Sequence, residues 1–138
     1  MKPTASSKPS PHFQRLHHIA IICSDYERAK DFYVRILGLQ VVRGNYRVER
    51  QSWKLDLASC EGWQIELFTY PGTPPRPTQP EALGLRHLAF AVENLDAAVA
   101  HLLAEGVAVE PVRTDEFTGK RFTFFKDPDD LPLELYER

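Results

Sequence analysis

The stretch "LHHIAI" at residues 16–21 has a counterpart in "LRHLAF" at residues 85–90. One offset aligns Leu16 with Leu85, His18 with His87 and Ala20 with Ala89. Residues alternate between two kinds in both stretches, as they do along a β-strand with two different faces. This one chain therefore contains the same strand twice.

The two copies continue in the same way after this strand. In the first, the capping-box pattern Ser24-x-x-Glu27 opens an apolar stripe at helical spacing that Gly38 closes. In the second, Asn94 opens a similar stripe and Gly106 closes it. Beyond each helix the apolar period shortens to that of strands. The predicted strands are "LQVVRGNYR", "WKLDLAS" and "WQIELFTY" in the first half, and "VAVEPV", "RFTFF" and "LPLELYE" in the second.

Each half is thus predicted to be a βαβββ module. At 138 residues the chain has the size of one domain. We expect a disordered tail over residues 1–14 and a single domain over 15–138, which comprises module one (15–70), a proline-rich connection (71–84) and module two (85–138). The expected fold class is α+β, with the two modules forming a curved cup of mixed β-sheet.

Composition excludes several classes of function. The net charge is -2, so no general basic field attracts nucleic acid or an anionic membrane. Cys23 and Cys60 are the two cysteines of the chain, and they form neither a disulfide framework nor a zinc-finger pattern. The first fifteen residues lack the apolar run of a signal peptide. We therefore expect a cytoplasmic protein with a small-molecule substrate.

Four polar residues stand on strands at matched positions of the repeat. His18 and His87 have the parity opposite to the bulky apolar residues of their strands, and small alanines follow them. Glu66 and Glu134 interrupt the apolar patterns "WQIELF" and "LPLELY". An unpaired carboxylate inside a strand is strongly disfavoured, so each glutamate requires a partner. Two imidazoles and two carboxylates suit one divalent ion such as Zn, Ni, Co, Mn or Fe; the alternative is that the histidines are hydrogen-bonded interior residues and the glutamates pair with arginines.

The segments "LHHIAIICSDYERAKDFYVRILGL", "WQIELF", "LRHLAFAVENLDAAVAHL" and "FFKDPDDLPLELYE" resemble the vicinal oxygen chelate superfamily. Within it, they are most similar to glyoxalase I-like proteins and to the short bacterial proteins of the YaeR type. The resemblance implies the glyoxalase/bleomycin resistance/dihydroxybiphenyl dioxygenase fold, with a metal held by His18, Glu66, His87 and Glu134. It also implies a lyase or isomerase in which a substrate chelates the metal through two neighbouring oxygens, while Glu66 or Glu134 moves a proton between adjacent carbons.

The resemblance also locates a difference. Glyoxalase I enzymes that act on a glutathione adduct usually carry an arginine where this chain has Ile22, and an asparagine where it has Tyr70. We therefore do not expect glutathione-dependent activity. A basic set is present instead, and its chemistry favours a small anionic substrate; solvated charges at strand edges are the alternative. The candidate substrate-binding residues are Arg47, Arg50, Lys54 and Arg121, in a wider set that includes Arg43 and Lys120.

Other functions of the superfamily remain open at this point. An Fe(II) dioxygenase needs two histidines, one carboxylate and open positions, and Glu66 would occupy one of these. An acyl-coenzyme A epimerase uses a similar metal frame, and a non-catalytic antibiotic-binding protein uses the fold without metal. By analogy we expect a homodimer in which His18 and Glu66 of one chain meet His87 and Glu134 of the other, although one chain closing its own cup would use the same four residues.

Overall fold

The computed structural model describes residues 11–138, so most of the predicted tail lies outside the described residues. Module one contains β1 (His18–Ile22), α1 (Tyr26–Lys30), β2 (Gln40–Arg47), β3 (Ser52–Ala58) and β4 (Gln64–Phe68). Module two contains β5 (Leu88–Val92), α2 (Leu95–Ala104), β6 (Arg113–Thr114), β7 (Arg121–Lys126) and β8 (Pro132–Glu137). A π-helical segment, η1 (Asp31–Ile36), extends α1, and a 3-10 turn, η2 (Val48–Arg50), connects β2 to β3. The predicted α+β class and the two βαβββ modules are present.

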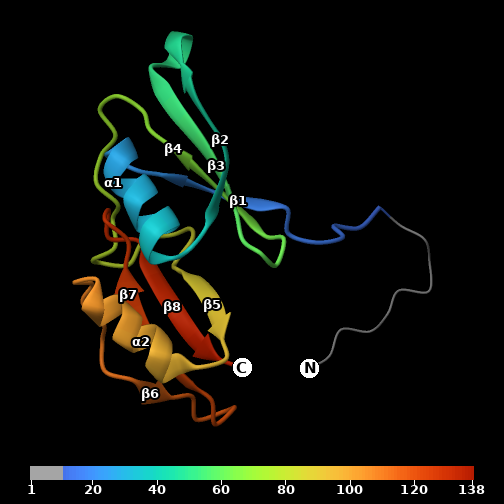
Figure 1. Cartoon of the computed structure of the whole chain (residues 1–138), viewed down its shortest axis with the longest axis vertical. Coiled ribbons are helices and arrows are strands. Elements are labelled where there is room, and N and C mark those ends of the chain that lie inside the picture. Colours follow the sequence, from blue (N-terminus) through green and yellow to red (C-terminus); the bar gives the residue numbers. More distant parts are fainter. Residues whose placement is uncertain (1–10) are drawn as a thin grey trace.

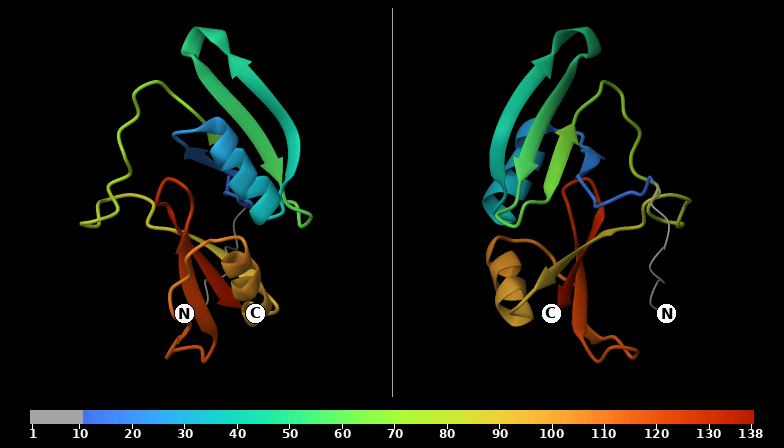
Figure 2. Two further views of the ribbon diagram at one scale, coloured as in Figure 1. Left: turned by 60° about the vertical axis from the view of Figure 1, so that its left-hand side comes forward. Right: turned by 90° about the vertical axis from the view of Figure 1, so that its right-hand side faces the viewer.

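Each module forms its own four-stranded mixed sheet. The strand orders are β1-β4-β3-β2 and β5-β8-β7-β6, and the first strand of each module lies parallel to the last. The registers match as well, because Ala20 lies opposite Glu66 and Ala89 lies opposite Glu134. Figures 1 and 2 show module one above module two, with α1 against one face of the first sheet and α2 against one face of the second. The repeat read from the sequence is thus a repeat of topology and of register.

The helix ends follow local chemistry. The first helix begins one residue later than the capping box predicts, because Asp25 accepts a hydrogen bond from the Arg28 backbone N–H at 2.9 Å. Ser24 instead donates its backbone N–H to Asp129 in module two. Asn94 caps α2 as predicted. Within residues 11–138, the helices are too short and too polar for any of them to cross a membrane.

The segment "VAVEPV" at residues 107–112 does not form the strand that its alternation predicts. The strand that pairs with β7 at this edge is the shorter β6, which begins after this segment and pairs through Arg113 and Thr114. The Glu110 backbone N–H still donates to the Phe124 carbonyl at 2.9 Å. Pro111 follows directly and has no N–H to continue a ladder, so regular pairing is interrupted there.

One apolar core joins the modules on their helix side. Module one contributes the fully buried Leu55, Leu57 and Ile65, and module two contributes Leu95 and Leu133. Polar contacts join the modules at the β7–β8 turn. The Tyr33 hydroxyl donates to Asp127 at 2.7 Å, and the Arg28 guanidinium donates to the Pro128 carbonyl at 3.1 Å. These contacts hold the helix side of the two sheets together and leave the opposite faces free of helices.

Candidate metal centre

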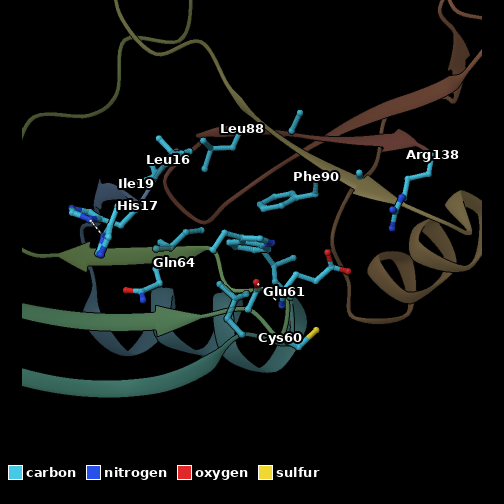
Figure 3. A pocket seen from close by; sticks show the side chains of 18 residues that line it. Leu16, His17, Ile19, Cys60, Glu61, Gln64, Leu88, Phe90 and Arg138 are labelled. Carbon is cyan, nitrogen blue, oxygen red and sulfur yellow. Dashed lines mark hydrogen bonds between the residues drawn. The ribbon is translucent and has the colours of Figure 1, made fainter. Parts of the chain in front are cut away.

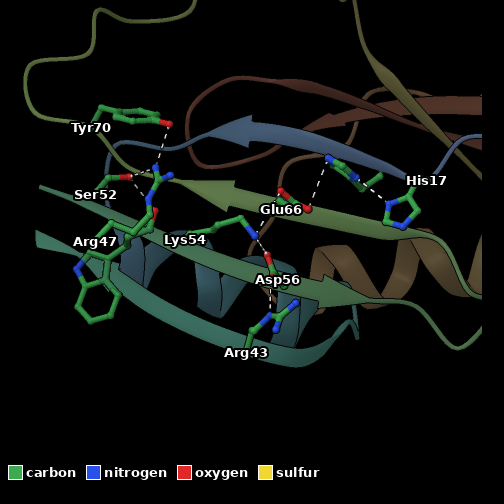
Figure 4. Close-up of polar contacts among 10 residues, drawn as sticks. His17, Arg43, Arg47, Ser52, Lys54, Asp56, Glu66 and Tyr70 are labelled. Atoms are coloured by element: carbon green, nitrogen blue, oxygen red, sulfur yellow. Dashed lines mark hydrogen bonds and ion pairs between the residues drawn. The ribbon is translucent and has the colours of Figure 1, made fainter. Parts of the chain in front are cut away.

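The face of each sheet opposite its helix carries the predicted metal ligands. Along β4, the buried Ile65 and Leu67 point to the helix, so Glu66 points to the other face. Figure 4 shows Glu66 on that face of module one, together with Lys54 and Asp56 of β3. His18 lies there as well, since it has the parity of Ala20, which is opposite Glu66. We call the two helix-free faces the concave face of module one and the concave face of module two.

His18 and Glu66 form the first pair. The His18 Nε2 atom lies 3.5 Å from a Glu66 carboxylate oxygen, and their side chains are 39% and 15% exposed. The Nδ1 atoms of His17 and His18 are 2.9 Å apart, so one ring donates to the other. A histidine whose second nitrogen is engaged in this way has its ring orientation fixed, as metal-ligating histidines usually do.

His87 and Glu134 form the second pair. The His87 Nε2 atom lies 2.9 Å from a Glu134 oxygen, and their side chains are 24% and 12% exposed. Arg86, the repeat counterpart of His17, donates to His87 Nδ1 at 3.2 Å. Arg86 has no acceptor, so the His87 ring carries its proton on Nε2 and donates it to Glu134. Metal ligation through Nε2 would require that proton to leave and Arg86 to release Nδ1.

The chain does not bring the two pairs together. Within residues 11–138, no three side chains of the His, Cys, Asp or Glu types gather closely enough to hold a metal ion. Each module therefore provides a two-residue half-site, with one imidazole nitrogen and one carboxylate in contact. Nitrogen and oxygen donors of this kind suit a first-row divalent ion, but structural and catalytic sites of this type use three or four protein ligands. A complete four-ligand site needs both half-sites.

Charge surrounds the half-site of module one. The Lys54 ammonium lies 2.7 Å from Asp56 and 3.7 Å from Glu66, and Arg43 contacts Asp56 at 2.9 Å. Burial alone would raise the pKa of Asp56, but the hydrogen bonds from Lys54 and Arg43 outweigh it and hold the pKa of this carboxyl below its usual value. Lys54, a predicted substrate-binding residue, therefore lies directly beside a predicted metal ligand.

The three other predicted substrate-binding residues lie in different places. Arg47 lies on the concave face of module one, where it contacts Ser52 and Tyr70 (Figure 4). Arg50 lies in η2 at the tip of the β2–β3 hairpin. Arg121 lies on the helix side of module two and pairs with Asp96 and Glu137. Of the predicted basic set, Arg47 and Lys54 thus share a face with His18 and Glu66.

On the concave face of module two, aromatic side chains stand at the positions that match Lys54 and Asp56, and the Arg113 guanidinium lies over two of their rings. Phe124 lies opposite Glu134 in the sheet, whereas Asp56 lies opposite Glu66. Phe122 lies opposite Tyr136, whereas Lys54 lies opposite Phe68. The edge of the His87 ring contacts the Phe124 ring, with centroids 5.1 Å apart. The two half-sites therefore share their ligands and register but differ in the chemistry beside them.

Two large cavities border these faces. A cavity of about 690 Å³ between the modules is lined by Leu16 and Phe90 (Figure 3), and also by Trp63 and His18. Another of about 660 Å³ lies between the proline-rich connection and module two, and His87 and Phe124 line it. Each cavity reaches one predicted ligand histidine and neither reaches both. We therefore place the candidate chemistry on the concave faces rather than in the larger cavity.

Sequence reasoning missed His17, Arg86 and Asp56. His17 and Arg86 have the opposite strand parity to the ligands, yet each contacts the Nδ1 atom of the histidine that follows it. His17 and Arg86 occupy equivalent positions of the repeat, directly before the two ligand histidines, and this equivalence could have identified them from the sequence. Asp56 occurs in the apolar run "LDL", and its alternation with Leu55 and Leu57 could have placed it beside Glu66.

Comparison with known proteins agrees with this fold. Residues 15–135 match the Glyoxalase/Bleomycin resistance protein/Dioxygenase superfamily, and the chain belongs to this family. It is 62% identical to the uncharacterized protein YwkD of Bacillus subtilis, over 89% of this chain and 96% of the relative. It is 56% identical to the uncharacterized protein YaeR of Escherichia coli, over 91% and 97%. The crystal structure of a glyoxalase family protein from Enterococcus faecalis superposes with a TM-score of 0.86 at 50% identity, and covers 91% of this chain and 98% of that one.

More distant matches show how varied the family is. The 2-epi-5-epi-valiolone epimerase of an Actinomyces species is 28% identical over 87% of this chain and 77% of that protein. Solved structures with this fold include TnmS3, an antibiotic-binding protein from Streptomyces, at 24% identity and a TM-score of 0.71. Proteins that resemble this chain or share its fold thus include an enzyme and a binding protein, so the site must decide the function.

Proposed function

We propose that the chain is a subunit of a divalent-metal-dependent lyase or isomerase of the glyoxalase I-like kind. Its substrate would be a small anionic molecule with two neighbouring oxygens. The metal would be held by His18, Glu66, His87 and Glu134, with two ligands from each of two copies of the chain. The ion would be one of Zn, Ni, Co, Mn and Fe, which share this preference for nitrogen and oxygen donors.

The observation that carries the proposal is the pair of matching half-sites. Each has a histidine and a glutamate in contact, and the glutamates lie at matching positions of β4 and β8. His18 is the first residue of β1, and His87 directly precedes β5. Each is partly exposed on a helix-free face, and residues 11–138 of one chain do not complete either. A homodimer would complete both at once, since a twofold axis that brings module one of one copy to module two of the other repeats the contact.

The residues of such a site fit a proton transfer between adjacent carbons. A bound divalent ion would polarise the substrate carbonyl and so acidify the neighbouring C–H group. Glu66 or Glu134 would accept the proton and return it to the adjacent carbon, which is general acid–base catalysis by one carboxylate. Lys54, 3.7 Å from Glu66, would offer a positive charge to an anionic substrate beside this carboxylate. The aromatic face of module two would exclude water.

Metal analysis tests the ligand set. Untagged protein purified without chelator is expected to contain about one divalent ion per chain. His87→Ala and Glu134→Gln are each expected to lower metal affinity at least about tenfold, because each removes one of four ligands. The control is His101→Ala, since His101 lies on α2 and contacts the Ile36 carbonyl. A protein that neither contains nor takes up metal would rule out the proposed lyase, and a loss in the control equal to that in the ligand variants would refute the assignment.

Epimerisation is a second candidate reaction, favoured by the 28% identity to 2-epi-5-epi-valiolone epimerase. It uses the same proton transfer but returns the proton to the carbon that lost it. Anionic hydroxy-carbonyl compounds incubated with the metal-loaded protein in D2O and followed by NMR distinguish the two. Deuterium at the original carbon with inversion indicates an epimerase, whereas rearrangement to a new carbonyl position indicates the lyase or isomerase.

A further inference from the structure

Three cations lie on the concave face of module one, and two of them have a carboxylate partner. Arg43 and Lys54 both contact Asp56, and Lys54 also approaches Glu66. Arg47 differs, because within residues 11–138 it forms no ion pair with any carboxylate. It is the cation on this face whose charge the described protein does not balance.

Neutral groups nevertheless hold Arg47 in a defined place. Its Nη2 atom donates to the Ser52 hydroxyl at 2.9 Å and to the Tyr70 hydroxyl at 3.1 Å. Its guanidinium carbon lies 5.1 Å from the centre of the Phe68 ring and 5.8 Å from that of Tyr70. The Phe68 and Tyr70 rings are nearly parallel, with an interplanar angle of 6°. The guanidinium is therefore oriented before any ligand arrives, which lowers the entropy cost of binding.

The donors of Arg47 are also incompletely used. Within the described part of the chain, Arg47 Nε is buried and has no hydrogen-bond partner, and its hydrogen bonds are made by Nη2 and not by Nη1. An unsatisfied buried donor is costly, and more so on a charged group. A planar cation with spare donors and no counter-charge matches the paired oxygens of a carboxylate or phosphate.

The position of Arg47 relates it to the predicted metal ligands. Glu66 and Phe68 are two residues apart on the same face of β4, a separation of roughly 7 Å along a strand. The guanidinium lies over Phe68, and Figure 4 shows Lys54 between Arg47 and Glu66. Arg47 and the half-site are therefore placed to contact opposite ends of one metabolite-sized molecule.

We infer that Arg47 binds an oxyanionic group of the substrate, a carboxylate or a phosphate, at a subsite separate from the metal ligands. Ser52, Phe68 and Tyr70 position the guanidinium. This inference rests on the proposed function for its location, but oxyanion binding by Arg47 does not require metal. Arg50, at the hairpin tip, and Arg121, paired with Asp96 and Glu137, take no part in it.

The test uses the full chain stripped of metal by a chelator, so that anions cannot bind through an ion. Inorganic phosphate and acetate are titrated at constant ionic strength, and the side-chain Nε–H signals of arginine are followed by ¹⁵N NMR. The Arg47 signal, identified by its absence in Arg47→Gln, is expected to shift and saturate. Arg47→Gln is expected to weaken binding of the tighter anion by about tenfold to a hundredfold, as for loss of a charge-assisted contact. Arg50→Gln removes the same charge and is expected to bind as the unaltered protein does.

Two further variants separate positioning from charge. Arg47→Lys keeps the charge but loses the planar fork, and an intermediate affinity is expected. Tyr70→Phe removes one acceptor, so a smaller loss accompanied by a shifted Arg47 signal is expected. Equal binding by Arg47→Gln and the unaltered protein, or an equal loss in Arg50→Gln, would overturn the inference. Because the titration uses metal-free protein, a negative result would reject oxyanion binding by Arg47 without testing the metal site. Metal analysis would still test the proposed lyase separately. Tighter phosphate indicates a phosphorylated substrate and tighter acetate a carboxylate.

Discussion

Asp127, at the contact between the two modules, affects the stability of the folded protein as well as the position of one module against the other. Asp127 lies in the β7–β8 turn, accepts a hydrogen bond from Tyr33 of module one, and also accepts the backbone N–H groups of Asp129 and Leu131. Burial raises the pKa of Asp127, and the bonds from Tyr33 and the backbone oppose this only in part. Burial likewise raises the pKa of the neighbouring Cys23 thiol to about 12, so Cys23 is not a reactive cysteine.

The raised pKa of Asp127 predicts a pH dependence of folding. The folded protein holds this proton more tightly than the unfolded chain, so the stabilising contribution is complete below the ordinary carboxyl pKa of 3.8. It is lost as pH rises through the raised folded pKa, by about 1.4 kcal/mol for each unit of elevation. Asp127→Asn is expected to remove this loss of stability.

The free energy of unfolding, measured with denaturant from pH 4 to 7, tests this prediction. The control is Asp130→Asn, since Asp130 is exposed in the same turn. Parallel pH profiles for the unaltered protein and both variants would contradict the prediction.

At the scale of elements, the approach of β2 to α1 depends on Gly44. A Cβ atom there would lie 2.8 Å from the Tyr26 hydroxyl and 3.3 Å from a Leu55 methyl group. Neither side chain moves freely, because Tyr26 stacks on Trp53 with centroids 4.4 Å apart and Leu55 is fully buried. β2 can thus pack against α1 at this point because Gly44 has no side chain.

Gly44→Ala is therefore expected to destabilise the protein by about 1–3 kcal/mol, as overpacking of a close contact does. The stack of Tyr26 on Trp53 is expected to loosen, which changes the tryptophan fluorescence of the folded state. Asn45→Ala is the control, since Asn45 is exposed on the next position of β2, and a change within about 0.5 kcal/mol is expected there. A Gly44→Ala protein as stable as this control would show that Tyr26 adjusts without cost.

Elements with a strong local signal were predictable, and those set by distant contacts were not. The strand alternation around His18, Glu66, His87 and Glu134, and the caps at Asn94 and Gly106, are local and were predicted from the sequence. The start of α1 was misplaced because Ser24 bonds to Asp129, which is distant in sequence. A strand was wrongly predicted over residues 107–112, because the apolar alternation was given more weight than the strand-breaking effect of Pro111. Arg47 and Arg121 could not be told apart, since their partners lie on other strands and on α2.

At the scale of the whole molecule, the two half-sites make the proposed dimer testable by mixing. His18→Ala damages module one and His87→Ala damages module two, so each variant alone is expected to lose both sites of its dimer. A mixed dimer would have one site with both defects and one site with neither. Random exchange of equal amounts is expected to restore about a quarter of full metal occupancy.

Metal content after co-refolding the two variants measures this restoration. The control is a mixture of His18→Ala with Glu66→Gln, which damages the same module in both copies, so no intact site can form. Equal occupancy in the two mixtures would show that each site lies within one chain or that no such site exists. Sedimentation of the same samples reports whether dimers have formed.

The differing neighbours of Glu66 and Glu134 have a consequence for the handedness of the product. If the two glutamates were equivalent, they would flank a bound substrate from opposite sides, and each could return the proton to its own face of the reacting carbon. Such a site would yield a racemic product. Asp56 faces Glu66 whereas Phe124 faces Glu134, and Lys54 corresponds to Phe122. Because these neighbours differ, the two glutamates are not equivalent, and we expect the proposed site to return the proton through one of them and so to favour a single enantiomer.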